Sequence, residues 1–395
     1  MTTIIIGGGI AGLYSAYQLK LANQPFLLLE KEATVGGRMG SPLFHGVHVA
    51  KGAGIGRKKK DKLLQALVKD LGIETHEFKA THQYVGSQLC DVKSIFQDLK
   101  TRWTNDRECD GLTFKEFAQP ILGPVIYKQF IMCAGYTDYE NEDVESTLYD
   151  YGFDDNYTNF TGISIPWTTL VQSLVAKIGK ENIKCHVEVL DIKRMSSTIE
   201  VKTRTRTYMC DRIILATTVH PLRKLLPEIK EYKNIESQPF LRIYGKFSKA
   251  SIPILKEVVG TTTIVPGPIH KIIPMDTEKG VYMIVYTDNK GADSLRPYTE
   301  NTEENRNVLC NELTKVLGLS KGELHLQSII SFYWTEGTHY YKPMTAELMS
   351  LYKTRSAFIK AAQRPYPNIF VVGEMISKKQ GWVEGALESV NAIMK

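Results

Sequence analysis

The sequence predicts an α/β protein with two domains, one built on a parallel sheet of βαβ units and the other an α+β domain with a mixed sheet plus helices. Two observations lead to this prediction. An apolar run at 2–6 precedes a glycine-rich turn and a helical pattern, and a second apolar run follows at 26–29; this order is typical of a βαβ unit. Strand-type runs then alternate with helical patterns along the 395 residues, a length that accommodates two cores.

The turn after the first run has the pattern G-x-G-x-x-G, in which the three glycines have separate roles. Gly7 makes the turn, Gly9 lets the backbone approach a pyrophosphate, and Gly12 lets the helix pack closely on the strand. Ile10 and Ala11 begin the helix, where free N–H groups and the helix dipole favour phosphate. The turn therefore predicts a dinucleotide site.

The end of the second run indicates which dinucleotide is bound. Glu30 stands about 20 residues past the glycines, where a carboxylate binds a ribose hydroxyl. The residues that follow, from Lys31 to Gly37 and Arg38, resemble the second fingerprint of the flavin amine oxidase superfamily. The resemblance implies a GR2-type Rossmann-like domain in which these residues contact FAD. Arg38 can neutralise the pyrophosphate through charge-assisted hydrogen bonds, so FAD is favoured over NAD.

A second motif lies near the C-terminus, at 368–374 and 380–389. It is similar to the C-terminal signature of flavin amine oxidases. The resemblance places Gly373 and Glu374 near the pyrophosphate and ribityl chain, and a helix N-terminus at Val383 to Ala386 against the flavin. The helix dipole there favours the negative charge of a reduced flavin. The two motifs bracket the chain and imply one split FAD site.

The resemblance also implies an aromatic cage beside the flavin. Trp382 matches one wall, and Tyr340 aligns best with the other. Such faces orient an amine, although Tyr340 as an ordinary core residue is the alternative. The cysteine that links flavin covalently in monoamine oxidases is absent and His339 stands near its place. We therefore expect noncovalent FAD, with a histidyl link as a minor alternative.

Two further segments match cofactor-contacting elements of the family. Gly52, Ala53 and Gly54 suit a turn that lies against the isoalloxazine ring, where a larger side chain would collide with it. Val189 falls where the family's valine contacts adenine through its backbone, and a core valine is the alternative.

Arg242 is the main departure from the family pattern. It occupies the strand position at which amine and polyamine oxidases place the lysine that holds a water at flavin N5. Arginine is permanently charged and forked, so it is not equivalent to lysine. Lys246 and Lys271 are candidate substitutes.

The split site predicts discontinuous domains. Residues 1–75, 160–236 and 364–395 form the expected FAD-binding domain, and residues 76–159 and 237–363 the expected substrate-binding domain. Helices are predicted at 61–72, through most of 91–150 and at 301–317; strands are predicted at 184–192, 199–201, 208–215, 241–247, 269–273, 281–287 and 327–334.

The composition and charge of the sequence argue against several classes of partner. The net charge of +6 is spread along the chain, which does not favour nucleic acid. The six cysteines lack paired spacing, which predicts free thiols in a reducing compartment and no metal site. No apolar run of about 18 residues exists to span a membrane. The acidic segment 138–155 could steer a cationic amine or simply be an exposed loop with its aromatic residues turned inward.

We therefore expect a soluble, cytoplasmic FAD-dependent oxidase, most like the compact members that large DNA viruses encode, and packaged in the virion if its source is viral. It would oxidise a small-molecule amine to an imine, and molecular oxygen would yield hydrogen peroxide. The sequence leaves open whether the protein forms a homodimer. The alternatives are a desaturase or isomerase of the protoporphyrinogen oxidase or carotenoid type, and a non-catalytic FAD-binding protein.

Overall fold

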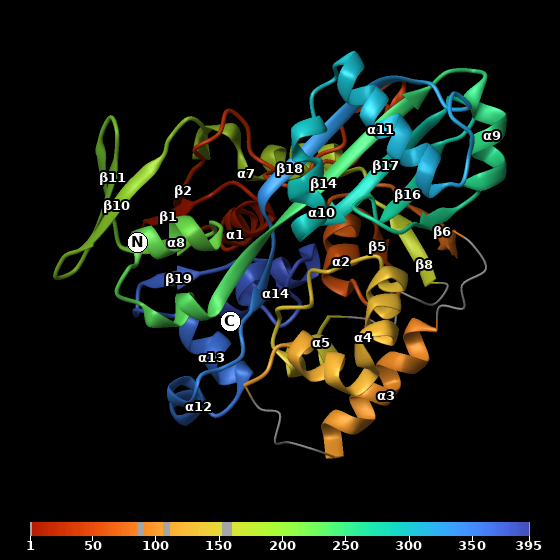
Figure 1. Ribbon diagram of the computed structural model, residues 1–395. Coiled ribbons are helices and arrows are strands. Elements are labelled where there is room, and N and C mark those ends of the chain that lie inside the picture. The colour runs from red at the N-terminus through yellow and green to blue at the C-terminus, as the bar shows by residue number, and fades with distance from the viewer. Residues whose placement is uncertain (1, 86–90, 106–110, 152–159, 395) are drawn as a thin grey trace.

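The computed structural model describes residues 2–85, 91–105, 111–151 and 160–394 (Figure 1). A five-stranded parallel sheet has the order β19-β13-β1-β2-β9. The first βαβ unit forms its centre, with Ile4 of β1 paired with Leu27 of β2 and Ile213 of β13. The strands are β1 (Thr3–Ile6), β2 (Phe26–Leu29), β9 (Ile183–Lys184), β13 (Arg212–Leu215) and β19 (Ile369–Val371).

Both faces of this sheet are covered, which explains why its strands are apolar throughout. Ile5 points toward one core, and Ile4 and Ile6 point toward the other. The first core lies under α1 (Ile10–Leu21), α2 (Lys62–Asp70), α7 (Trp167–Ile178) and α14 (Val383–Met394). The second lies under α8 (Val219–Leu225), α13 (Arg355–Ala362) and the sheet β10 (Val189–Arg194), β11 (Ile199–Thr203), β12 (Thr207–Cys210), with α12 (Ala346–Tyr352) next to it.

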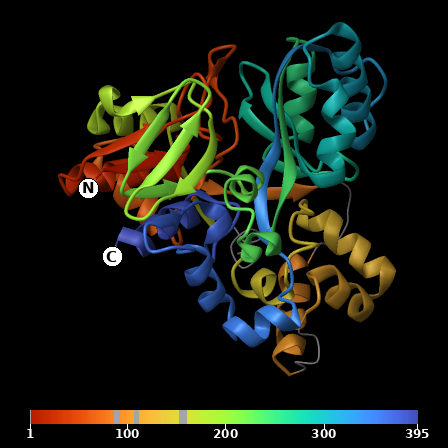
Figure 2. The ribbon, with the colours of Figure 1, turned by 90° about the vertical axis from the view of Figure 1, so that its left-hand side faces the viewer.

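A six-stranded sheet with the order β18-β14-β17-β16-β15-β7 builds the other half of the molecule (Figures 1 and 2). Its strands are β7 (His82–Tyr84), β14 (Ile235–Phe247), β15 (Thr262–Ile264), β16 (Lys271–Asp276), β17 (Val281–Asp288) and β18 (Leu326–Tyr341). One face packs on α9 (Ser251–Val258), α10 (Asn289–Leu295) and α11 (Glu303–Val316). The opposite face is thereby left to line a cavity.

Smaller elements complete the fold. Helices α3 (Val92–Asn105), α4 (Phe114–Ala134) and α5 (Val144–Tyr149) share a core of their own, and both views show them as a layer below the six-stranded sheet (Figures 1 and 2). A hairpin joins β3 (Leu43–Phe44) to β4 (Val47–His48), and a small sheet joins β5 (Gly56–Arg57), β8 (Phe160–Ser164) and β6 (His76–Ala80). No helix in the described ranges is long and apolar enough to cross a bilayer.

The structure corrects three expectations. The strand expected at 184–192 is divided, because His186 has a φ of 57° and the Val187 N–H donates to the Glu30 carbonyl at 2.8 Å. The strand expected at 327–334 continues to Tyr341. Cys133 is disulfide-bonded, so the expectation of free thiols is wrong there, although Cys185, Cys210 and Cys310 are free.

Candidate active site

One cavity of about 2000 Å³ runs between the parallel sheet and the six-stranded sheet. Pockets for one drug-sized ligand are about 300–1,000 Å³, so this volume suits a dinucleotide together with a second molecule. Every residue predicted to bind the cofactor lines it except Gly12, whose predicted role was packing. Those that line it are Gly7, Gly9, Ile10, Ala11, Glu30, Lys31, Gly37, Arg38, Gly52, Ala53, Gly54, Val189, Gly373, Glu374, Trp382, Val383 and Ala386.

The glycine turn between β1 and α1 lines the cavity. Gly7 has a φ of 105°, and a Cβ on it would lie 2.5 Å from the Ala216 carbonyl oxygen. A Cβ on Gly12 would lie 1.9 Å from the Gly7 carbonyl oxygen. A Cβ on Gly9 would meet no protein atom within 4 Å and would project into the cavity. The turn is therefore tight on its protein side and open on its cavity side.

Glu30 lies at the end of β2 and is buried. Its carboxylate accepts hydrogen bonds from the N–H groups of Gly8, at 2.6 Å, and Glu32, at 2.8 Å. These bonds fix the carboxylate at the cavity wall, next to the turn. Val189 lines the same region at the start of β10. Both residues that the sequence predicts to contact the adenosine half of a dinucleotide thus line the cavity.

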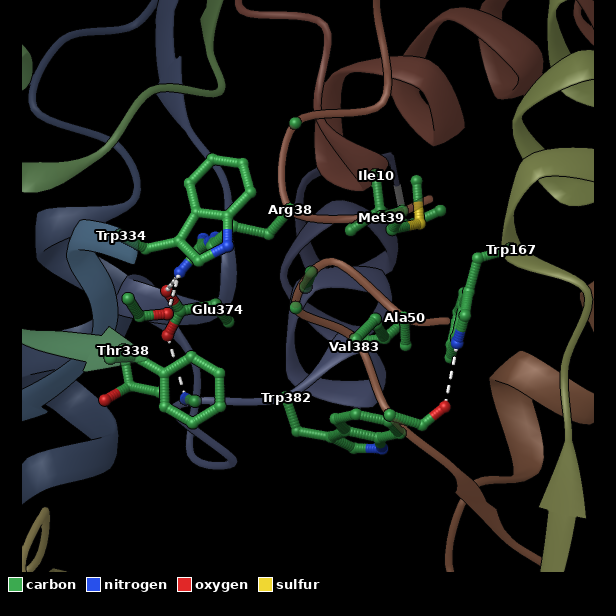
Figure 3. A pocket seen from close by; sticks show the side chains of 18 of the residues that line it. Ile10, Arg38, Met39, Ala50, Trp167, Trp334, Thr338, Glu374, Trp382 and Val383 are labelled. Atoms are coloured by element: carbon green, nitrogen blue, oxygen red, sulfur yellow. Dashed lines mark hydrogen bonds and ion pairs between the residues drawn. The ribbon is translucent and has the colours of Figure 1, made fainter. Parts of the chain in front are cut away.

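Arg38 and Glu374 join the two sequence motifs directly, although they are far apart in the chain (Figure 3). Arg38 Nη1 donates to Glu374 Oε1 at 2.9 Å and to the Gly337 carbonyl at 2.6 Å. Glu374 also accepts from His339 Nδ1 at 2.5 Å and from the Gly381 N–H at 2.8 Å. Burial alone would raise the pKa of Glu374, but His339 and Arg38 hold it at about 2. The carboxylate is therefore charged and fully bonded.

His339 is fully buried and does not line the cavity. Its Nδ1 faces Glu374, and its Nε2 faces the Val219 N–H at 3.4 Å. Burial would lower the pKa of His339, but Glu374 and Glu336 raise it. Because both ring nitrogens are directed at protein groups, the geometry does not support the histidyl link considered as an alternative.

The turn at 52–54 lines the cavity. A Cβ on Gly52 would lie 2.7 Å from the Arg38 carbonyl oxygen, and one on Gly54 would lie 3.1 Å from Arg242 Nη2. Trp167 Nε1 donates to the Gly54 carbonyl at 2.8 Å and holds the turn in place (Figure 3). The Arg242 guanidinium therefore lies directly against this turn.

The N-terminus of α14 brings Trp382 and Val383 to the cavity (Figure 3). Tyr340 does not join them: it lines a separate small pocket together with His339 and Gln380. The stretch of β18 that lines the cavity ends at Thr338, and Trp334 lies on it with its Nε1 donating to the Lys51 carbonyl at 2.9 Å. The expected pairing of Tyr340 with Trp382 is thus not present.

The six-stranded sheet supplies the rest of the wall. Lys271 lines the cavity, and its Nζ lies 2.8 Å from the ring centre of Tyr136. Burial lowers the pKa of Lys271 well below its usual range, which Asp288 and Asp138 partly oppose. Lys246 faces away from the cavity, and its Nζ donates to the Lys279 carbonyl. Of the two candidate substitutes for the missing lysine, only Lys271 reaches the site.

The acidic segment contributes to the wall in a way that the sequence did not indicate. Asp138 and Asp150 line the cavity. Burial raises the pKa of Asp138 to about 7 and that of Asp150 to about 6. Glu142 and Asp143 are buried, so the description of this segment as an exposed acidic loop is wrong for them. Its residues 152–155 lie outside the described residues.

Comparison with protein-family models identifies the chain. Residues 113–390 match the model described as flavin containing amine oxidoreductase. The chain belongs to this family. Residues 5–71 also match the model of the NAD(P)-binding Rossmann-like domain, which covers the glycine turn and Arg38. The match agrees with the α/β fold and makes the chain an oxidoreductase of a flavoprotein family. No curated protein sequence matches it significantly.

Solved structures share the fold at low sequence identity. A putrescine oxidase variant matches with a TM-score of 0.76 and 14% identity over 100% of this chain and 98% of that chain. The wild-type putrescine oxidase bound to putrescine matches with a TM-score of 0.74 and 14% identity, with the same coverage. A putative protoporphyrinogen oxidase from Exiguobacterium matches with a TM-score of 0.71 and 15% identity over 100% and 97% of the two chains.

Several residues of the site were not found from the sequence. Tyr136, Phe240 and Tyr286 line the cavity around Arg242 and Lys271, but they come from separate elements and no local motif marks them. Trp334 could have been found from the sequence. It is an aromatic residue at the end of the strand predicted at 327–334, just before the segment that contains Tyr340.

Proposed function

We propose that the protein is an FAD-dependent oxidase that converts a primary or secondary amine to an imine, with molecular oxygen reduced to hydrogen peroxide. The imine would hydrolyse to an aldehyde. The observation that carries the proposal is the continuity of the cavity, which extends from the open side of Gly9 to an aromatic chamber at Arg242. A dinucleotide at one end would thus reach a second molecule at the other.

The residues present fit FAD. The open side of Gly9 would accept a pyrophosphate, and the Glu30 carboxylate next to it would bind a ribose; the turn at 52–54 offers backbone without bulky side chains. In this proposal residues 1–75, 160–236 and 364–395 hold the cofactor, and residues 76–159 and 237–363 hold the substrate. Binding is noncovalent, because His339 is bonded within the protein.

When bound, FAD supplies the hydride acceptor and passes the electrons to oxygen. The chain's own residues bind and orient the amine. Trp382, Phe240 and Tyr286 present aromatic walls, which exclude water and fix the direction of the substrate. The N-terminus of α14 directs its dipole at the cavity, where it would stabilise negative charge on the cofactor.

The test is a peroxide and aldehyde assay on the purified, FAD-loaded protein with mono-, di- and polyamines. We expect at least one amine to yield aldehyde and peroxide in equal amounts. A yellow protein that yields neither with any amine would contradict the proposal. Turnover of a porphyrinogen in the absence of amine turnover would instead favour the desaturase alternative, whose fold the chain also shares.

A further inference from the structure

We propose that the substrate amine also carries a carboxylate, and that Arg242 binds this group. The inference rests on the proposed function and narrows its substrate class from amines in general to amino acids. Its basis is a buried positive charge on the cavity wall for which the described residues offer no negative partner.

Arg242 projects from the centre of β14 and is 2% exposed. Its Nε and Nη1 atoms have no hydrogen-bond partner among the described residues, and no described carboxylate lies within ion-pair distance. Its guanidinium carbon lies 4.6 Å from the ring centre of Tyr286 and 5.2 Å from that of Phe240, and the side chains that interact with it, Tyr286 and Tyr244, are uncharged tyrosines. A buried guanidinium without an anion is costly, so a ligand that supplies the anion would be strongly favoured.

Two other cations on the cavity wall, Arg38 and Lys271, do face protein carboxylates. Arg38 is paired with Glu374 at 2.9 Å. Lys271 faces Asp288 and Asp138, and Asp288 is held in place by the backbone N–H of Thr137 at 3.0 Å. Arg242 differs from both because its fork is directed at the cavity and not at a protein carboxylate. A diamine such as putrescine would bring further positive charge to this wall, whereas a carboxylate can accept two parallel N–H bonds from it.

The surroundings of Arg242 fix where the substrate would lie. The guanidinium faces the Gly54 turn, with Nη2 3.1 Å from the position of a Cβ on Gly54. Tyr286 and Phe240 pack edge to face at 5.2 Å beside it. A carboxylate on Arg242 would therefore anchor one end of the substrate between aromatic rings and direct its amine-bearing carbon toward the turn. Loss of a hydride from that carbon and a proton from nitrogen gives an imino acid, which water converts to a keto acid and ammonia when the amine is α to the carboxylate.

The first test is binding, which does not depend on turnover. The oxidised holoenzyme is titrated with phenylacetate and, as the neutral control, phenylacetamide, while the flavin absorbance and the melting temperature are followed. We expect phenylacetate to perturb both and phenylacetamide to have little effect. Arg242→Gln should weaken phenylacetate binding by about 30-fold or more, and Arg242→Lys by less. Lys246→Gln removes one positive charge from the same strand outside the cavity and should bind phenylacetate as the wild type does.

Equal weak binding of phenylacetate and phenylacetamide by the wild type would overturn the proposal, even if the Arg242 variants fail to fold. So would an Arg242→Gln protein that binds phenylacetate normally but has a shifted flavin reduction potential, because Arg242 would then serve the flavin alone.

The second test compares anaerobic flavin reduction by matched pairs: phenylalanine and phenethylamine, γ-aminobutyrate and butylamine, and ornithine and putrescine. We expect the carboxylate-bearing member of at least one pair to react faster by tenfold or more. Faster reaction by the simple amines would overturn the carboxylate proposal and leave amine oxidation standing. Reaction by no compound, with phenylacetate still bound through Arg242, would instead contradict amine oxidation alone.

Discussion

Substitutions at Gly9 are expected to change the affinity for the cofactor without lowering the stability of the apoprotein. It is the N-cap of α1, with a φ of −72° that any residue can adopt and no side-chain cap. A Cβ at this position would meet no protein atom within 4 Å. Gly9→Asp adds a favourable N-cap and a negative charge at the positive end of the helix, so the apoprotein should be unchanged or more stable by up to about 1 kcal/mol.

The same carboxylate would enter the place proposed for the pyrophosphate. Two like charges about 4 Å apart repel by roughly 4 kcal/mol at an effective dielectric constant of about 20, which corresponds to about a thousandfold loss of affinity. Gly9→Asn is the matched variant, because it caps the helix and fills the same space without the charge. We expect FAD binding to weaken with Asn and to weaken much further with Asp.

The assay is FAD titration of the apoprotein by fluorescence, with thermal unfolding of the apoprotein in parallel. A Gly9→Asp protein that binds FAD with wild-type affinity would refute the placement of the pyrophosphate. A Gly9→Asp apoprotein that unfolds several degrees earlier than wild type would refute the view that the turn is open on this side.

Three further outcomes are expected. Gly12→Ala should destabilise the fold by about 1–3 kcal/mol or more, because its Cβ would lie 1.9 Å from the Gly7 carbonyl oxygen. The measurement is thermal unfolding, and the control variant is Gly260→Ala, whose Cβ would have its nearest contact at 3.9 Å. Glu374→Gln should cost about 3–5 kcal/mol. The lowered pKa of Glu374, about 2 against 4.5, contributes stability that is present above pH 4.5 and is lost as the pH falls to about 2, so the acid limb of stability against pH should be flatter in this variant. Trp382→Ala should lower kcat/KM for the amine about tenfold, whereas Trp382→Phe should lower it less in the peroxide assay.

Local features of the site were predictable from sequence, because the residues that decide them are close together in the chain. The roles of Gly7, Gly9 and Gly12 follow from one turn, and the structure gives each glycine the surroundings that its role requires. The strand divided at His186 was not predictable, because its left-handed backbone is fixed by a bond from the Val187 N–H to the distant Glu30 carbonyl.

Features that depend on sheet register or on distant charges were missed. Tyr340 was expected at the cavity, but β18 continues past Thr338 and carries Tyr340 beyond the cavity wall. The sequence identified Arg242 as a departure from the family pattern, but not that it is buried with no acidic partner among the residues that the structure describes. That property depends on which carboxylates the folded chain brings near each cation, and Asp288 and Asp138 are brought to Lys271 instead.

Joint occupation of this cavity by FAD and an oxidisable amine is tested most directly by anaerobic mixing of the FAD-loaded protein with simple amines and amino acids while the visible flavin absorbance is recorded. We expect at least one of these compounds to bleach the flavin, and admitted oxygen to restore the colour with formation of hydrogen peroxide. Flavin absorbance that stays unchanged with every compound would contradict this expectation.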